Sequence, residues 1–143
     1  REWEDATNPN ELTRASYIPE DFIPLMEAGR VELVDGNREV YPGVTVVQTP
    51  GHNKGHHSVK IESDGKTAFF LGDMIPTAAH IPLPYVMGYD LYPLELLELK
   101  RRILREAMEC NWLMIFEHDP KIRMGYLRKV NGKLTVEEVS GIE

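Results

Sequence analysis

One long amphipathic helix between two groups of short apolar strands dominates this sequence. Apolar residues recur at helical spacing from residue 93 to about 110, which predicts a helix there. The basic side chains of this helix are expected to face solvent: Lys100, Arg101, Arg102 and Arg105. Alternating or apolar runs predict strands on both sides of it: 31–34, 44–48, 58–62, 67–71, 112–116, 126–130 and 134–139. The order predicts an α/β or α+β domain with one sheet covered by helices.

The first 30 residues predict short helices. Asn8 to Glu11 carries helix-start signals, so a short helix is expected to follow and to stop before Pro19. A second short helix is expected at 19–28, interrupted by Pro24 and capped by Gly29. The chain opens without Met, on residues that resemble the end of an element. We therefore expect a fragment of a longer protein, with a processed N-terminus as the alternative.

Composition excludes several function classes. The chain has 143 residues, of which 42% are hydrophobic, and it contains 16 Lys and Arg against 23 Asp and Glu. A net charge of −7 argues against nucleic-acid binding and against docking on anionic membranes. No apolar run approaches the roughly 20 residues of a membrane span. The single cysteine, Cys110, cannot form an internal disulfide, so a reducing, cytoplasmic location is expected.

Polar side chains follow three of the predicted strands. His52 lies in a glycine-rich turn after the strand at 44–48, Asp73 follows the strand that ends at Leu71, and Glu117-His118 follows the strand at 112–116. Each feature alone is typical of an ordinary turn. Together they predict that His52, Asp73 and His118 converge at one sheet edge. Imidazole and carboxylate groups are ligands for Zn, Mn or Fe, so a metal site is one interpretation of this edge.

The order of these motifs resembles the C-terminal half of the metallo-β-lactamase superfamily of hydrolases. The resemblance covers residues 31–130 and rests on three motifs: Thr49-Pro50-Gly51-His52 with Gly55-His56, Gly72-Asp73, and the late strand that ends at His118. The segments Gly-Asp-Met-Ile-Pro-Thr and Glu-His-Asp-Pro are similar to those of lactonase-like members, which include quorum-quenching lactonases and organophosphate hydrolases. The implied fold is half of a four-layer αββα sandwich.

The resemblance also implies a set of roles. His52 corresponds to a ligand of a first metal, His118 to a ligand of a second, and Asp73 to the catalytic carboxylate that bridges both. His56 corresponds to a histidine near the site that does not bind metal, while His57 is expected to be structural. Two divalent ions are implied, Zn first and Mn or Fe as alternatives. A metal-bridging hydroxide would then hydrolyse a small ester, lactone or phosphotriester.

The long loop at 74–92 is the expected substrate-facing segment. It contains His80, Tyr85 and Tyr89, any of which could support the site or line a substrate pocket. A tyrosine hydroxyl near two metals could donate to a developing oxyanion. The alternative is that these side chains only pack the loop onto the sheet.

The chain departs from the family in one large respect. The motif His-x-His-x-Asp-His, which supplies the remaining ligands, is absent. Residues 1–143 are therefore expected to be the C-terminal part of one domain that is inactive by itself and whose partner is the missing N-terminal half, with a homodimer as a further expectation. Other hypotheses are a glyoxalase-type thioesterase, a sulfur dioxygenase, or a non-catalytic domain without metal.

Overall fold

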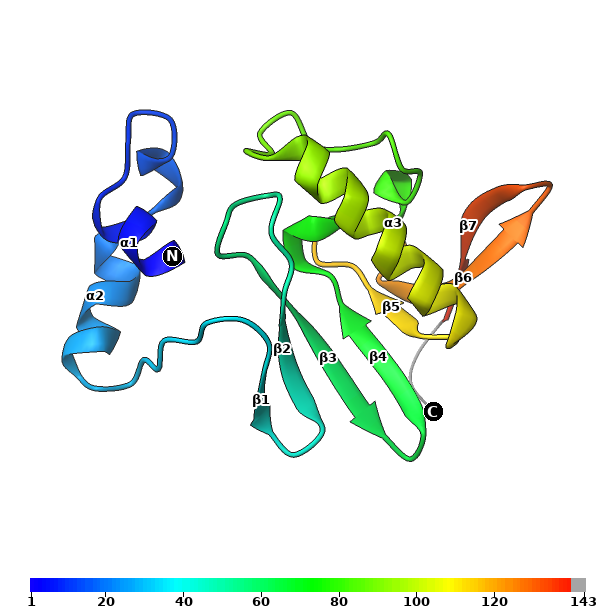
Figure 1. Cartoon of the computed structure of the whole chain (residues 1–143), viewed down its shortest axis with the longest axis horizontal. Helices are drawn as coiled ribbons and strands as arrows, with labels where there is room; N and C mark the ends of the chain where they lie inside the picture. The colour runs from blue at the N-terminus through cyan, green and yellow to red at the C-terminus, as the bar shows by residue number, and fades with distance from the viewer. Residues whose placement is uncertain (140–143) are drawn as a thin grey trace.

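A seven-stranded sheet forms the body of the protein in the computed structural model, which describes residues 1–139 (Figure 1). The strands lie in chain order across the sheet, and neighbours are antiparallel except β4 and β5. Their bounds are β1 (Arg38–Tyr41), β2 (Val44–Gln48), β3 (His57–Ser63), β4 (Lys66–Phe70), β5 (Leu113–Ile115), β6 (Met124–Val130) and β7 (Lys133–Glu138). The mixed α/β class and the half-sandwich predicted from sequence are confirmed.

The long helix α3 (Pro93–Glu109) covers one face of this sheet (Figure 1). It connects β4 to β5, and a crossover of this kind is what makes two successive strands parallel. The core lies between helix and sheet, where Phe69 stacks on Trp112 with ring centroids 5.3 Å apart. Leu96 and Leu104 face this core from α3. The prediction of a single long amphipathic helix is therefore confirmed.

The opposite face of the sheet carries two rows of apolar side chains. Because side chains alternate between faces, the neighbours of the buried Phe69 point away from α3. Strand register aligns them across β2 to β6, in one row of Val46, Val59, Phe70, Ile115 and Met124 and a second of Val44, Ile61, Ala68, Leu113 and Tyr126. The first row is only half-buried, so this apolar face is incompletely covered in this chain.

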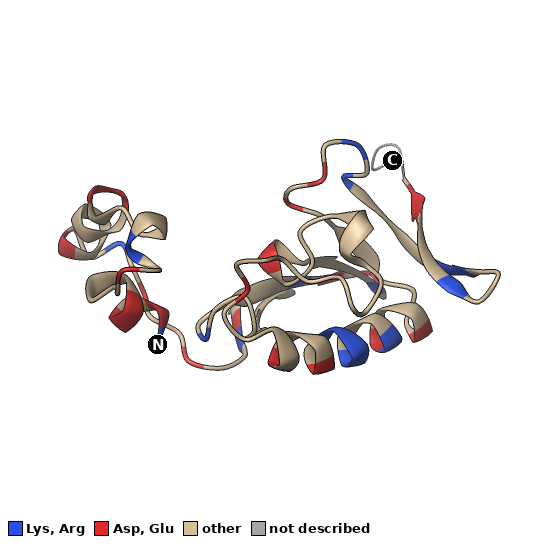
Figure 2. Ribbon diagram, turned by 90° about the horizontal axis from the view of Figure 1, so that it is seen from above, with Lys and Arg blue, Asp and Glu red and all other residues tan. Residues whose placement is uncertain are grey.

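The N-terminal helices form a separate cluster beside the sheet (Figure 2). They are α1 (Glu2–Thr7), the 3₁₀ turn η1 (Arg14–Ser16) and α2 (Pro19–Glu27). Trp3 packs edge-on against Phe22, which joins α1 to α2. The helix α2 with its Gly29 end is as predicted, although Pro24 lies within it without ending it.

One local prediction in this region was confirmed only in part, and another was wrong. The short helix expected after Asn8 and before Pro19 is the single 3₁₀ turn η1, and Asn8 itself ends α1, where its N–H and its side-chain amide donate to the carbonyl of Glu4. Residues 31–34 do not form a strand; the edge strand that pairs with β2 is β1, further along the chain.

Two further 3₁₀ turns shape the segment between β4 and α3. They are η2 (Gly72–Met74) and η3 (Ala78–His80), which interrupt an otherwise irregular loop. Lys100 of α3 corrects the sequence analysis here: its side chain is fully buried beneath this loop rather than exposed. Among the described residues, no helix combines the length and the hydropathy needed to cross a membrane.

Candidate metal centre

His52 is presented by a tight turn between β2 and β3. The turn is closed by a hydrogen bond of 2.8 Å from the Thr49 N–H to the His56 carbonyl. Gly51 lies at φ +142°, and a Cβ there would lie 2.5 Å from the Cβ of Leu96. Only glycine permits this close approach to α3 together with this backbone conformation. The fit of Gly51 against α3 therefore determines where His52 lies.

Asp73 lies on η2, directly after the buried end of β4. One carboxylate oxygen of Asp73 is 3.6 Å from Nε2 of His52, and the other is 3.2 Å from Nε2 of His118. The Asp73 side chain is about one-third exposed, so the group is accessible from the surface. The structure therefore brings the three predicted side chains together, with the carboxylate between the two imidazoles.

His118 is positioned by a short loop after β5. Its backbone N–H donates to the Pro76 carbonyl over 3.0 Å. The neighbouring Asp119 accepts backbone N–H groups from both sides of this contact, at Ala78 and at Ile122. Burial acts to raise the pKa of Asp119, but the N–H groups it accepts outweigh that effect and hold the pKa below its usual value. Asp119 thus fastens the two loops that bear Asp73 and His118.

His56 supports the site, but both of its ring nitrogens are engaged by other groups of the protein. Its Nδ1 lies 2.7 Å from the Thr49 hydroxyl, and its Nε2 accepts the backbone N–H of Asp73 over 3.0 Å. Burial lowers the pKa of His56, and the nearby His52 lowers it further. A neutral imidazole of this kind holds the backbone of Asp73 in place. His57 instead contacts the carbonyls of Gly55 and Gly36.

Glu117 is a donor that the sequence analysis did not select. Asp73, Glu117 and His118 each offer one ligand atom, and these atoms all lie within 4.8 Å of one another. The signal in the sequence was the adjacency of Glu117 to His118 after an apolar strand. Carboxylate and imidazole donors at such spacing fit a divalent ion.

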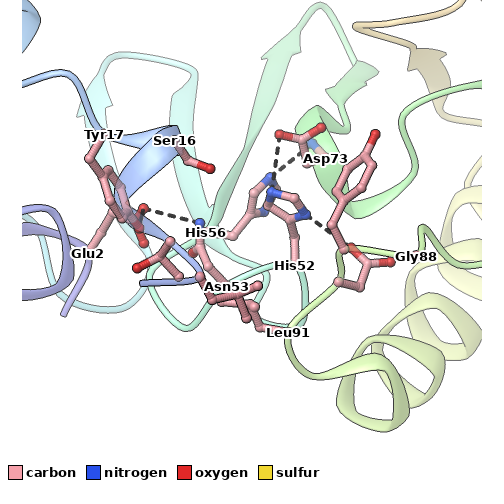
Figure 3. A pocket seen from close by; sticks show the side chains of 13 residues that line it. Glu2, Ser16, Tyr17, His52, Asn53, His56, Asp73, Gly88 and Leu91 are labelled. Carbon is pink, nitrogen blue, oxygen red and sulfur yellow. Dashed lines mark hydrogen bonds and ion pairs between the residues drawn. The ribbon is translucent and has the colours of Figure 1, made fainter. Parts of the chain in front are cut away.

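Two cavities meet at this cluster. The larger, of about 600 Å³, is lined by His52, His56, Asp73 and Tyr89 together with residues of the N-terminal cluster (Figure 3). The smaller, of about 340 Å³, is lined by His80, His118 and again Tyr89. Tyr89 also packs edge-on against the ring of His52. Of the loop candidates, His80 and Tyr89 therefore face the site.

Tyr85 takes a different position from the other loop candidates. Its side chain is largely exposed, and it lines neither of these two cavities in the described part of the chain. Its backbone carbonyl accepts a hydrogen bond from Lys100. Tyr85 thus contributes to the loop through its backbone.

The N-terminal cluster forms the far wall of the larger cavity. In Figure 3, Glu2 and Tyr17 lie opposite His52 and Asp73. The Tyr17 hydroxyl donates to the Glu2 carboxylate over 2.6 Å, and the side-chain amide of Asn53 donates to the same oxygen over 3.1 Å. Burial and the Glu2 carboxylate raise the pKa of Tyr17 above its usual value. The turn that bears His52 is therefore tied to the N-terminal cluster.

Comparisons with known proteins show which proteins this chain is similar to. No family model matches the sequence. An N-acyl homoserine lactonase from Bacillus thuringiensis is 38% identical over 53 residues, which are 37% of this chain and 20% of that protein. The chain therefore spans much less than the whole length of this curated relative. An N-acyl homoserine lactonase from Bacillus cereus is 37% identical over 51 residues, or 36% of this chain and 19% of its own length.

Solved structures match over more of the chain. A "probable metal-dependent hydrolase" from Staphylococcus aureus superposes with a TM-score of 0.81 at 25% identity, covering 98% of this chain and 51% of that one. An N-acyl homoserine lactone hydrolase with product bound at its catalytic metal centre superposes with a TM-score of 0.64 at 25% identity, over 84% of this chain and 45% of that one. A hydrolase of the β-lactamase superfamily shares the fold, with a TM-score of 0.74 at 19% identity over 98% of this chain and 51% of its own.

The fold and the cluster together define the class. This chain has the architecture of the C-terminal part of a metallo-β-lactamase superfamily hydrolase, and the lactonase-like members are among its relatives. The resemblance predicted from the sequence motifs is confirmed.

Proposed function

We propose that the protein that carries this sequence is a metal-dependent hydrolase that opens small lactones, with esters and phosphotriesters as related substrates. The observation that carries the proposal is the position of the Asp73 carboxylate, 3.6 Å from His52 and 3.2 Å from His118. The lactonases and metal-dependent hydrolase among the similar proteins support this reaction class.

The residues at the cluster fit divalent metal. Imidazole nitrogen and carboxylate oxygen suit Zn, with Mn or Fe as alternatives. His52 would hold one ion, His118 the other, and Asp73 would contact both, with Glu117 close enough to add a donor. When bound, two divalent ions would activate water and polarise the electrophilic oxygen of the substrate.

The chain's own residues have separate tasks in this scheme. Asp73 sets the spacing of the two histidines, and His56 holds the backbone of Asp73 through its N–H. Tyr89 borders both cavities, so its hydroxyl is a candidate donor to the carbonyl oxygen of a substrate. Lactone hydrolysis joins a water oxygen to the carbonyl carbon and breaks the ring C–O bond, whose oxygen takes up a proton. No side-chain nucleophile is required.

The open sheet face supports a second part of the proposal. The apolar row from Val46 to Met124 is half-buried on the face away from α3, as is expected of a sheet that packs on another sheet. The chain matches about half the length of the similar solved structures. We therefore propose that residues 1–143 are the C-terminal part of one domain, whose other half supplies the second sheet and the remaining ligands. A homodimer is the alternative occupant of this face.

A charge-removing substitution in the whole protein tests the function. Asp73→Asn should lower hydrolysis of an N-acyl homoserine lactone by about a hundredfold or more. Loss of a group that only orients a metal ligand lowers activity by about 10–100-fold, and loss of a ligand should lower it at least as much. Asp64→Asn is the matched control, since Asp64 lies in the exposed turn between β3 and β4. Ring opening is followed by chromatography, with protein-bound metal measured on the same samples.

The outcomes separate the alternatives. Full lactonase, esterase and phosphotriesterase activity in a folded, metal-loaded Asp73→Asn variant would refute the proposal. Faster hydrolysis of a thioester than of any lactone would instead support the glyoxalase-type thioesterase.

A further inference from the structure

Asp90 is a buried carboxylate that the proposed mechanism does not yet use. Its side chain is only 1% exposed, although it lies in the irregular loop before α3. One oxygen lies 3.0 Å from Nδ1 of His52, and the other accepts the backbone N–H of Met87 over 2.7 Å. A buried carboxylate is costly unless its oxygens are hydrogen-bonded, and both oxygens of Asp90 are.

Backbone hydrogen bonds hold Asp90 and His52 in register. The Leu91 N–H donates to the His52 carbonyl over 3.0 Å, and the Tyr92 N–H donates to the Gly51 carbonyl over 2.8 Å. The residue directly after Asp90 is thus bonded to the residue that Asp90 contacts. The geometry of this pair is therefore built by the main chain and does not depend on side-chain rotamers alone.

Lys100 fastens the other end of the same loop. Its buried ammonium donates to the carbonyls of His80 and Tyr85, each over 2.7 Å, and to that of Pro82 over 3.1 Å. These bonds link α3 to the loop from below. The loop that presents Asp90 is consequently anchored both at the His52 turn and on the long helix.

A carboxylate in this position determines which ring nitrogen of His52 bears the proton. A carboxylate oxygen only accepts, so in the neutral ring of His52 Nδ1 donates and Nε2 keeps its lone pair. Nε2 is the atom that lies 3.6 Å from Asp73. We propose that Asp90 is a positioning residue that fixes the tautomer of His52 and so makes Nε2 its metal-binding atom, an inference that rests on the proposed metal site.

Asp90→Asn reverses this preference with almost no change in shape. The backbone N–H of Met87 is a fixed donor, so the amide oxygen of the variant faces it and the NH₂ group faces His52. Nδ1 must then accept, which moves the ring proton to Nε2. Asp64→Asn removes the same charge in an exposed turn at positive φ, which Asn tolerates, and is the matched control.

Two measurements on the chain test the proposal. Ring ¹⁵N chemical shifts of His52, recorded without metal about two pH units above the ordinary histidine pKa of about 6.5, report the tautomer directly. Zinc titration reports the affinity of the site. We expect Nδ1–H in the unmodified chain, Nε2–H in Asp90→Asn, and zinc binding weakened by about 10–100-fold in that variant. Asp64→Asn should match the unmodified chain in both measurements.

Each other result has a defined meaning. An Nε2–H ring in the unmodified chain, or a tautomer unchanged by Asp90→Asn, overturns the inference whatever the zinc affinity. A switched tautomer with unchanged zinc affinity also overturns it, provided that His52→Ala weakens binding. Zinc binding that His52→Ala leaves unchanged overturns the assignment of His52 as a ligand, and with it the purpose assigned to the tautomer. Zinc binding that is indifferent to Asp73→Ala as well overturns the proposed metal site.

Discussion

The backbone N–H of Asp73 donates to Nε2 of His56. His56 therefore holds in place the carboxylate residue that lies between His52 and His118. Because Nε2 is occupied and burial lowers the pKa of His56, this imidazole is neutral and directs its remaining N–H toward Thr49. His56 therefore shapes the site through the main chain of Asp73.

Replacing His56 should harm stability more than metal binding. His56→Leu leaves the Asp73 N–H without an acceptor, which costs about 1–3 kcal/mol of unfolding free energy. Zinc affinity should fall less than in Asp73→Ala. His57→Leu is the matched control and should leave zinc affinity unchanged, because the ring nitrogens of His57 contact the backbone carbonyls of Gly55 and Gly36 and not the Asp73 loop. Urea unfolding and zinc titration measure both effects. If His56→Leu abolishes zinc binding as completely as Asp73→Ala, His56 is itself a ligand.

Gly51→Ala should destabilise the protein through a clash as well as through its backbone conformation. The new Cβ would lie 2.5 Å from that of Leu96, and the residue has φ +142°. Strain and overpacking each cost about 1–3 kcal/mol. Gly29→Ala is the control, since Gly29 also has positive φ (+65°) but open space around it. Thermal and urea unfolding compare the two. Equal losses would show that the turn can move away from α3.

Lys100 should make stability depend on pH in the alkaline range. Burial lowers its pKa from 10.5 to about 8, with Asp90 acting in the opposite direction. Between those values the unfolded chain binds more protons than the folded one, so the unfolding free energy rises as pH increases from about 8 to 10.5. In Lys100→Met this rise should be absent. The loop carbonyls left without a donor should lower the unfolding free energy by about 1–3 kcal/mol at neutral pH. Urea midpoints across this window measure both quantities, and an identical pH slope in the two proteins would contradict the assignment.

The isolated chain should hold at most one tightly bound zinc ion. His52 and His118 belong to different ions in the proposed site, and only Asp73 is shared, while zinc normally needs at least three protein ligands. His52 and His118 both lie beside the Asp73 carboxylate, so these three donors can gather on a single ion. Native mass spectrometry with intact mass on the same sample gives the stoichiometry. Two tightly held ions on a chain that begins at Arg1 would show that the ligands are misassigned.

Local chemistry explains which predictions held. Strands β2, β3 and β4 and the helix α3 were found because hydrophobic periodicity is a property of neighbouring residues. The last hairpin was found from Asn131-Gly132, where both residues have positive φ as its tight turn requires. The strand predicted at 31–34 was wrong because alternation marks a segment that could pair, whereas residues 38–41 are the ones that pair with β2.

The sequence by itself determined the order of elements, the half-sandwich class and the identity of the three polar residues that follow strands. Only the tertiary structure decided their partners. Asp90 reaches His52 across 38 residues because a loop folds back onto the turn, and the charge of Lys100 is buried because that loop offers it carbonyl groups. The physical reason is that periodicity and turn chemistry act between neighbours in the chain, whereas a buried polar group is stabilised by whichever distant atoms packing brings within hydrogen-bonding distance.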